Sequence, residues 1–230
     1  PLVGSIRQSN WILFMATLHP HKNDHGQPVT LTVPSTPTGL DCWTDATRHA
    51  TVIPQSPMPA MLNGIAIDSW HGAPADKAGW EYLAATARFP EPAFDVKLGT
   101  SAASGVVAVE LDGRVWVVSP SNRFGGYSNT FPKGKQTPGE GLSLRANAIK
   151  EAHEESGLRI ELTAFLVDSE RSSSTTRYYL GRRVGGNPAD MGWETQAVHL
   201  VPRGLLAGVV AHQNDQAILA ALDRLLPLDG

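Results

Sequence analysis

The chain has 230 residues, an ordinary hydrophobic fraction of 41% and a formal net charge of −3 at pH 7. This length accommodates one large domain, or a domain with a substantial extension. The slight negative charge argues against a general nucleic-acid-binding protein, which normally carries a strongly basic face. The single cysteine, Cys42, cannot form an intramolecular disulfide, which is typical of the cytoplasm or another reducing compartment. We interpret it as a buried thiol, because no histidine stands at a spacing that would indicate a nucleophile.

No segment reaches the roughly 18 consecutive apolar residues that span a bilayer. The longest apolar run, residues 11–18, is short, and we interpret it as a buried strand. The alternative is the apolar part of a secretion signal, but no clean cleavage pattern follows the run. The sequence therefore does not predict a membrane protein.

Residues 1–98 are rich in proline, threonine and histidine, and their periodicity is weak. Strand-like segments occur at residues 11–17 and 29–33, and a helical segment at residues 78–88. Prolines interrupt the longer elements of this half. We expect a loop-rich N-terminal extension or a small subdomain that packs on residues 99–230.

Stronger patterns begin near Gly105. Two apolar strands, residues 106–111 and 115–118, are joined by Asp112-Gly113, which predicts a β-hairpin. A long loop and a helix follow, and the rest of the chain predicts three more strands and a final helix, at residues 159–167, 176–183, 196–201 and 214–226. Strands with helices on either side form an α/β sandwich around a mixed sheet.

The helix predicted at about residues 143–156 has clear ends, because Ser143 is a good N-cap and Gly157 suits a left-handed C-terminal position. It carries an inner apolar stripe of Leu144, Ala148, Ile149 and Ala152, which leaves its charged face to a cleft.

Three carboxylates crowd that charged face. Glu151, Glu154 and Glu155 are spaced i, i+3 and i+4, and like charges at this spacing repel one another. A divalent cation explains why they are gathered, since carboxylate oxygens are the usual ligands of magnesium and manganese. The alternative, a solvated acidic face, is common for an isolated helix of this kind.

The glutamates and the glycine-broken loop before them resemble the Nudix box, G-x5-E-x7-R-E-U-x-E-E-x-G-U, where U is aliphatic. Gly134 and Glu140 fit its first half, and residues 151–158 fit its second half. The two halves are two residues too far apart, an insertion that we place in the loop because a helical insertion would rotate the glutamates apart. Lys150 stands where the family has an arginine thought to hold the catalytic glutamate by a forked ion pair.

This resemblance implies a Nudix-like α/β/α sandwich over residues 99–230. It implies a Nudix-type pyrophosphohydrolase that uses Mg²⁺ or Mn²⁺ to cleave a nucleoside diphosphate linked to another moiety. Glu154 and Glu155 would be metal ligands, Glu151 a ligand or the general base, and Gly134 a ligand through its carbonyl. The partner would be a small-molecule nucleotide rather than a membrane or nucleic acid. Many members are dimers, so a homodimer stays open.

Other candidate site residues lie outside the box. Several members take a further catalytic glutamate from a later loop, for which Glu194 is the candidate and Glu170 a weaker one. Basic and aromatic groups suited to phosphates and bases are Arg123, Lys133, Lys135, Arg177 and Tyr179, each also explicable as a surface charge or a core tyrosine. The histidines are interpreted as surface or loop residues: His19, His21, His25 and His153.

The substrate is not defined by the sequence. The segment Phe131-Pro132-Lys133-Gly134 resembles the entry to the box in dinucleoside polyphosphate hydrolases, and Ser174 stands where many ADP-ribose pyrophosphatases have proline. ADP-ribose or another nucleotide sugar and a dinucleoside polyphosphate both remain open. The alternative function is a non-catalytic, Nudix-like nucleotide-sensing module, which the widened box and Lys150 would suit.

Overall fold

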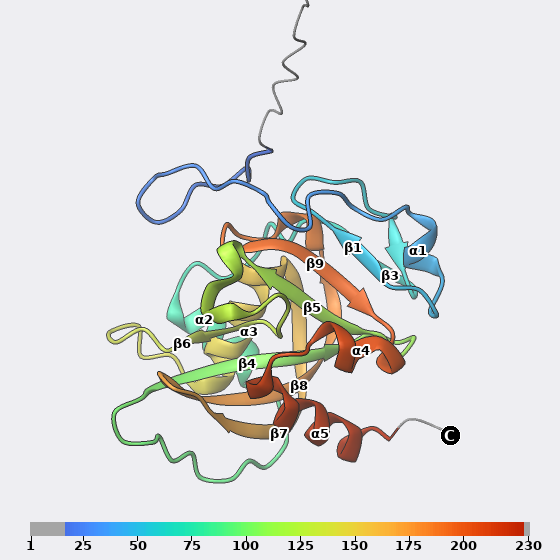
Figure 1. Cartoon of the computed structure of the whole chain (residues 1–230). Helices are drawn as coiled ribbons and strands as arrows, with labels where there is room; N and C mark the ends of the chain where they lie inside the picture. The colour runs from blue at the N-terminus through green and yellow to red at the C-terminus, as the bar shows by residue number, and fades with distance from the viewer. Residues whose placement is uncertain (1–16, 228–230) are drawn as a thin grey trace, which may run out of the picture.

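A mixed β-sheet forms the centre of the protein (Figure 1). The computed structural model describes residues 17–227, so the strand expected at residues 11–17 lies almost wholly outside the described residues. Within that range the sheet has seven strands in the order β1-β9-β5-β4-β8-β7, with β6 paired to β4. The strands are β1 (Ala50–Val52), β4 (Ser101–Val109), β5 (Val115–Pro120), β6 (Lys133–Lys135), β7 (Leu158–Glu170), β8 (Ser174–Gly186) and β9 (Thr195–Val201).

The expected hairpin is confirmed: β4 and β5 pair antiparallel, with Val109 opposite Val115. Alternate side chains of these strands enter two separate cores, as the two-residue period of a strand requires. Val106 and Trp116 pack on one face of the sheet, whereas Val107 and Val117 pack on the other. Both faces are therefore covered. β4 also runs parallel to β8, so the sheet is mixed as expected.

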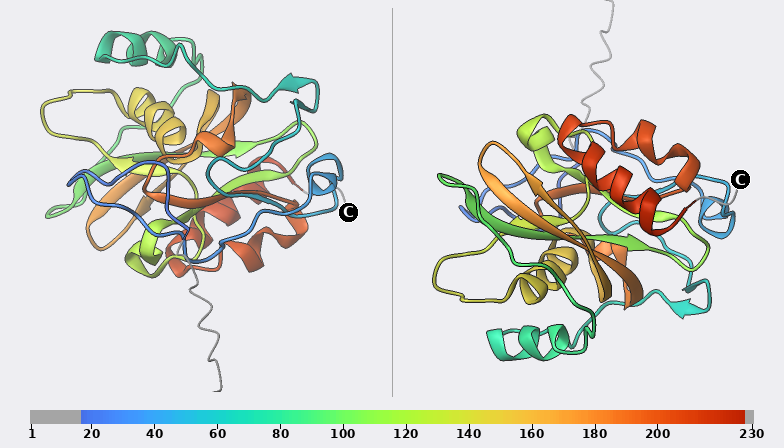
Figure 2. Two further views of the ribbon diagram at one scale, coloured as in Figure 1. Left: turned by 90° about the horizontal axis from the view of Figure 1, so that it is seen from above. Right: turned by 90° about the horizontal axis from the view of Figure 1, so that it is seen from below.

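Helices cover the two faces of the sheet (Figure 2). The first core contains residues of α3 (Leu144–Ser156), and the second contains residues of α4 (Arg203–Val209) and α5 (Gln216–Leu225). This arrangement is the predicted α/β/α sandwich, although α4 and the short β6 were not expected. Among the helices of residues 17–227, none combines the length and apolar character needed to cross a membrane.

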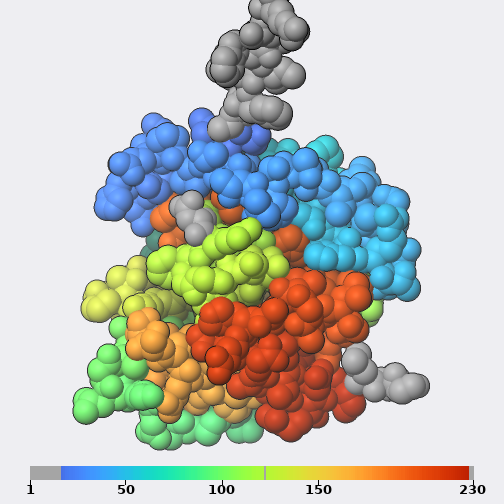
Figure 3. All heavy atoms as spheres, in the orientation of Figure 1, coloured from blue at the N-terminus to red at the C-terminus, as the bar shows by residue number. Residues whose placement is uncertain are grey.

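The N-terminal half is loop-rich, with short elements: α1 (Asp41–Thr44), β2 (Met61–Leu62), β3 (Ile65–Ala66) and α2 (Lys77–Ala84). The strand expected at residues 29–33 is reduced to a single bridge between Leu18 and Thr30. β1 adds an edge strand to the central sheet beside β9, and α2 lies outside α3. In Figure 3 the blue atoms of this half cover the top of the molecule.

Buried arginines of the second half hold the N-terminal half in place. Arg114 donates to the carbonyl oxygens of Cys42 and Trp43, at 2.9 and 2.5 Å. Arg183 donates to Leu62 O at 2.8 Å and pairs with the buried carboxylate of Glu110. Each guanidinium thus satisfies buried carbonyl groups of the short elements α1 and β2, which is a requirement for burying them.

Candidate active site

Helix α3 carries the three glutamates, and its ends are those expected. The Ser143 side chain accepts a hydrogen bond from the N–H of Ala146, and Gly157 has a left-handed φ of 67°. The predicted inner stripe is buried or packed against the first core. Glu151 is buried, Glu155 is half-buried and Glu154 is exposed, so the three carboxylates lie at different depths on one helix.

Gly134, the middle residue of β6, lies directly against the helix. A Cβ atom on Gly134 would stand 2.0 Å from the carboxylate carbon of Glu151, so any larger residue there would displace the Glu151 side chain. Glu155 accepts a 2.9 Å hydrogen bond from the backbone N–H of Lys133. Asn147 donates to the carbonyl oxygen of Gly134 at 3.2 Å. The structure therefore brings the two halves of the box together where β6 meets α3.

The inner carboxylates repel one another in a poorly solvated place. Burial, together with the charges of Glu155 and Glu154, raises the pKa of Glu151 to about 8. Burial also raises the pKa of Glu155 to about 7, against the opposing effect of Lys133. A nearby cation would stabilise both ionised forms.

Lys150 faces the outer carboxylates. Its Nζ lies 2.9 Å from Oε2 of Glu154 and 3.9 Å from Oε2 of Glu140. Partial burial lowers the pKa of Lys150, but the hydrogen bond to Glu154 and the charges of the nearby carboxylates together outweigh this effect, and the net pKa is raised. Lys150 therefore contacts a box glutamate with one ammonium group, where an arginine could offer a fork.

Glu151, Glu154, Glu140 and Lys150 line a cleft of about 730 Å³. Glu194, the candidate for a further carboxylate of the site, lies just before β9 and lines the same cleft. Burial raises the pKa of Glu194, and the charges of Asp24 and Glu154 add to the effect. Glu170 lies elsewhere, in a surface ion pair with Lys97.

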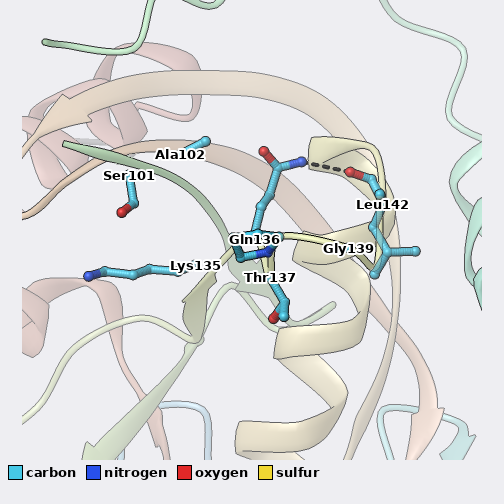
Figure 4. Close-up of a pocket in the computed structure, with 9 residues that line it drawn as sticks. Ser101, Ala102, Lys135, Gln136, Thr137, Gly139 and Leu142 are labelled. Atoms are coloured by element: carbon cyan, nitrogen blue, oxygen red, sulfur yellow. Dashed lines mark hydrogen bonds between the residues drawn. The ribbon is translucent and has the colours of Figure 1, made fainter. Parts of the chain in front are cut away.

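The predicted phosphate-binding residues are dispersed. The Lys133 Nζ lies 5.3 Å from the centre of the Tyr127 ring, and Arg123 is exposed on the 3₁₀ turn Ser121–Gly126. Lys135 lines a different pocket, of about 550 Å³, between the start of β4 and the loop before α3. Figure 4 shows that pocket, with Gln136 donating to the carbonyl of Leu142 at 2.7 Å.

Two of the predicted substrate-binding residues are part of the fold instead. All five N–H groups of Arg177 donate hydrogen bonds, to Asp168, Glu91 and the carbonyls of Pro92 and Ala93, at 2.7–3.2 Å. The buried Tyr179 donates its hydroxyl to Glu91 at 2.8 Å. Arg177 consequently has no donor left for a phosphate, and the structure does not bring either residue into the cleft.

The surface position expected for His153 is wrong. Its ring lies 4.8 Å from that of Trp70 and 6.2 Å from that of Trp80, so the N-terminal half covers it. The sequence also did not indicate that the N-terminal half lines the cleft, where His21, Lys22 and Asp24 face α3 beside Trp193. No local pattern could have shown this, because the contact joins segments about 170 positions apart, as between Asp24 and Trp193.

Within residues 17–227, no three or more His, Cys, Asp and Glu side chains are grouped so that they could hold a metal ion alone. Magnesium commonly takes one or two protein carboxylates and completes its shell with water and substrate phosphate oxygens. The glutamates of α3 and the Gly134 carbonyl are such an all-oxygen donor set. The residues present therefore fit a magnesium or manganese ion shared with a substrate, rather than a closed protein site.

Residues 99–222 match the family model described as the NUDIX domain, which is more than half of the chain. The protein therefore belongs to the Nudix family of pyrophosphohydrolases. No curated protein sequence matches the chain.

Solved structures of other proteins align with the chain at low identity. An Ap4A hydrolase from C. elegans aligns with a TM-score of 0.46 and 17% identity, over 55% of this chain and 98% of that one. A MutT protein from Methanosarcina mazei Go1 has a TM-score of 0.46 and 13% identity, over 57% and 100%. An ADP-ribose pyrophosphatase from Streptococcus suis has a TM-score of 0.45 and 18% identity, over 56% and 94%.

Proposed function

We propose that this enzyme is a metal-dependent hydrolase of the pyrophosphate bond in a nucleoside diphosphate linked to another moiety. The observation that carries the proposal is the mutual repulsion between the buried Glu151 carboxylate, which lies against Gly134 of β6, and the half-buried Glu155 carboxylate. A helix that only faced solvent would have no reason to bury them. The chemistry is assigned to residues 99–230, in a cytoplasmic protein, in keeping with its free thiol at Cys42.

The box residues would hold the cation. Glu151 and Glu155 lie against β6, at Gly134 and Lys133 respectively. Glu154 is exposed and pairs with Lys150. When bound, Mg²⁺ or Mn²⁺ would neutralise phosphate oxygens and acidify a water molecule. Asn147 of α3 donates a hydrogen bond to the carbonyl oxygen of Gly134, which fixes β6 against the helix.

Glu194 is assigned as the general base. It lines the same cleft as Glu151 and Glu154, and its pKa is raised, mainly by burial, toward the range in which a carboxylate accepts a proton well. Its backbone is fixed, since its carbonyl oxygen accepts a 2.6 Å hydrogen bond from the N–H of Ser121. Glu194 would take the proton of the attacking water while the bridging oxygen leaves with the departing phosphate.

The substrate class is a nucleotide sugar, ADP-ribose included, or a dinucleoside polyphosphate. A phosphorus NMR screen with Mg²⁺ or Mn²⁺ over these compounds, NADH and coenzyme A would identify the products directly. Glu154→Gln is expected to abolish turnover, because it removes a proposed metal ligand. The variant should stay folded, because the Glu154 side chain is exposed. Turnover that survives in this variant contradicts the proposal.

The ion pair between Lys150 and Glu154 favours a second candidate, a nucleotide sensor, because it engages a carboxylate that is predicted to bind the metal. A sensor would raise its melting temperature when it binds a nucleotide, by mass action, and would release no phosphate product. The same NMR screen, combined with thermal shifts, separates the two functions.

A further inference from the structure

A segment of the N-terminal half, residues 17–32, folds back on itself beside the cleft, and we call it the strap. The N–H of His19 donates to Val29 O at 2.8 Å, and the N–H of Leu31 donates to Thr17 O at 2.7 Å. The side chains of His19, Val29 and Leu31 are buried. The strap thus packs on the protein through these three side chains, while most residues of its turn, 21–26, are exposed.

Side chains on both sides of Glu194 anchor the strap. Trp193 donates its indole N–H to Asp24 at 3.2 Å. Gln196 accepts a 2.6 Å hydrogen bond from the N–H of Thr32 and donates to Thr30 O at 3.2 Å. The strap is therefore fixed to the segment that carries the assigned base.

The strap forms one wall of the cleft. His21, Lys22 and Asp24 line it together with Glu151 and Glu154 of α3. The part of the cleft formed by residues 99–230 is strongly acidic, and its cation, Lys150, is already paired with carboxylates. Lys22 is exposed in the cleft and makes no ion pair with any residue of 17–227.

A polyphosphate substrate carries more negative charge than a single cation bound at the glutamates can neutralise. A lysine on the N-terminal segment that lines the cleft can bind such a phosphate as a mobile point charge. We propose that Lys22, held at the cleft by the strap, binds a substrate phosphate group that the carboxylate helix does not engage. This assignment rests on the proposed function and makes the N-terminal segment a part of the substrate site.

Steady-state kinetics with Mg²⁺ and the best substrate test the proposal, using Lys22→Ala and Lys97→Ala. Lys97 is a matched control, since its Nζ pairs with Glu170 on the surface at 3.0 Å. Lys22→Ala is expected to raise KM about 10-fold and to change kcat less than about 2-fold. Lys97→Ala should leave both constants unchanged, and both variants should keep the melting temperature. A KM for Lys22→Ala equal to that of the wild type overturns the proposal.

Trp193→Phe tests the role of the strap without removing the lysine. It keeps an aromatic ring but loses the N–H that holds Asp24. A several-fold rise in KM with a normal melting temperature supports the anchoring role. An unchanged KM in this variant shows that the strap does not position Lys22.

Calorimetry with inorganic tripolyphosphate separates this proposal from the proposed function. If no compound is turned over, but Lys22→Ala weakens tripolyphosphate binding about 10-fold, the hydrolase assignment fails and the strap site stands. If turnover is found and Lys22→Ala changes neither KM nor binding, the hydrolase stands and the strap site fails. A wild type that binds no tripolyphosphate and shows no Lys22 effect on KM also overturns the strap site.

Discussion

Lys150 Nζ donates a 2.9 Å hydrogen bond to Oε2 of Glu154, one turn further along α3. The same ammonium group lies 3.9 Å from Glu140, so one side chain connects the loop half of the box with its helix half. An arginine at this position could bind both carboxylates at once through its planar fork. The substitution in this chain therefore retains the charge and loses the fixed geometry.

Lys150→Arg is expected to raise kcat/KM by up to about 10-fold, because a forked pair would orient Glu154 more firmly. Lys150→Met should lower kcat/KM about 10- to 100-fold, in line with the loss of a partner that orients a metal ligand. Arg182→Met is the control, since Arg182 of β8 forms an exposed ion pair with Glu161 of β7. Equal activity in the Lys150 variants would mean that the pair is a surface contact without a role in the reaction.

Gly134→Ala should abolish activity while the protein stays folded. The added Cβ would lie 2.0 Å from the Glu151 carboxylate, so this side chain has to move. Displacing a catalytic group by about 1 Å costs on the order of 100-fold in rate. Gly208→Ala is the matched control, because a Cβ at Gly208, in α4, meets nothing within 4 Å. Kinetics and thermal melting of both variants give the answer, and full activity in Gly134→Ala contradicts the placement of Glu151.

His199→Gln tests a buried histidine of β9 that contacts His49, the residue before β1. Burial and the nearby His49 lower the pKa of His199 to about 3, and its Nε2 contacts Ser119 Oγ at 2.7 Å. Below about pH 6.5, the usual pKa of histidine, this residue binds a proton in the unfolded chain but not in the folded protein, so acid destabilises the fold. Between pH 7 and 5 the wild type should lose about 2 kcal/mol of unfolding free energy relative to His199→Gln. Urea titrations at the two pH values measure this difference, and parallel losses would refute it.

Arg177→Met should destabilise the protein by about 3–5 kcal/mol, because it leaves the carboxylates of Asp168 and Glu91 without their buried partner. The exposed Arg182→Met should cost no more than about 1 kcal/mol. In the folded fraction of Arg177→Met, KM should equal that of the wild type. A stable Arg177→Met protein with a raised KM would return Arg177 to the substrate site.

Local patterns predicted much of the second half of the chain. The Asp112-Gly113 turn, the Ser143 cap and the Gly157 end are all decided by neighbouring residues, and the structure has each of them. The spacing of Glu151, Glu154 and Glu155 likewise depends only on the pitch of one helix. The spacing of these predicted site carboxylates could therefore be read from the sequence, and Glu194, predicted from its place before a strand, lines the same cleft as Glu151 and Glu154.

The sequence alone determined the family, the sandwich of helices on a mixed sheet and the acidic helix. Only the tertiary structure decided that Arg177 is enclosed by loops of the N-terminal half, and that Lys22 lines the same cleft as Glu151 and Glu154. The physical reason is the range of the contacts involved. Arg177 and Pro92 are 85 residues apart and Trp193 and Asp24 are 169 apart, so these hydrogen bonds depend on how the whole chain packs and leave no local pattern.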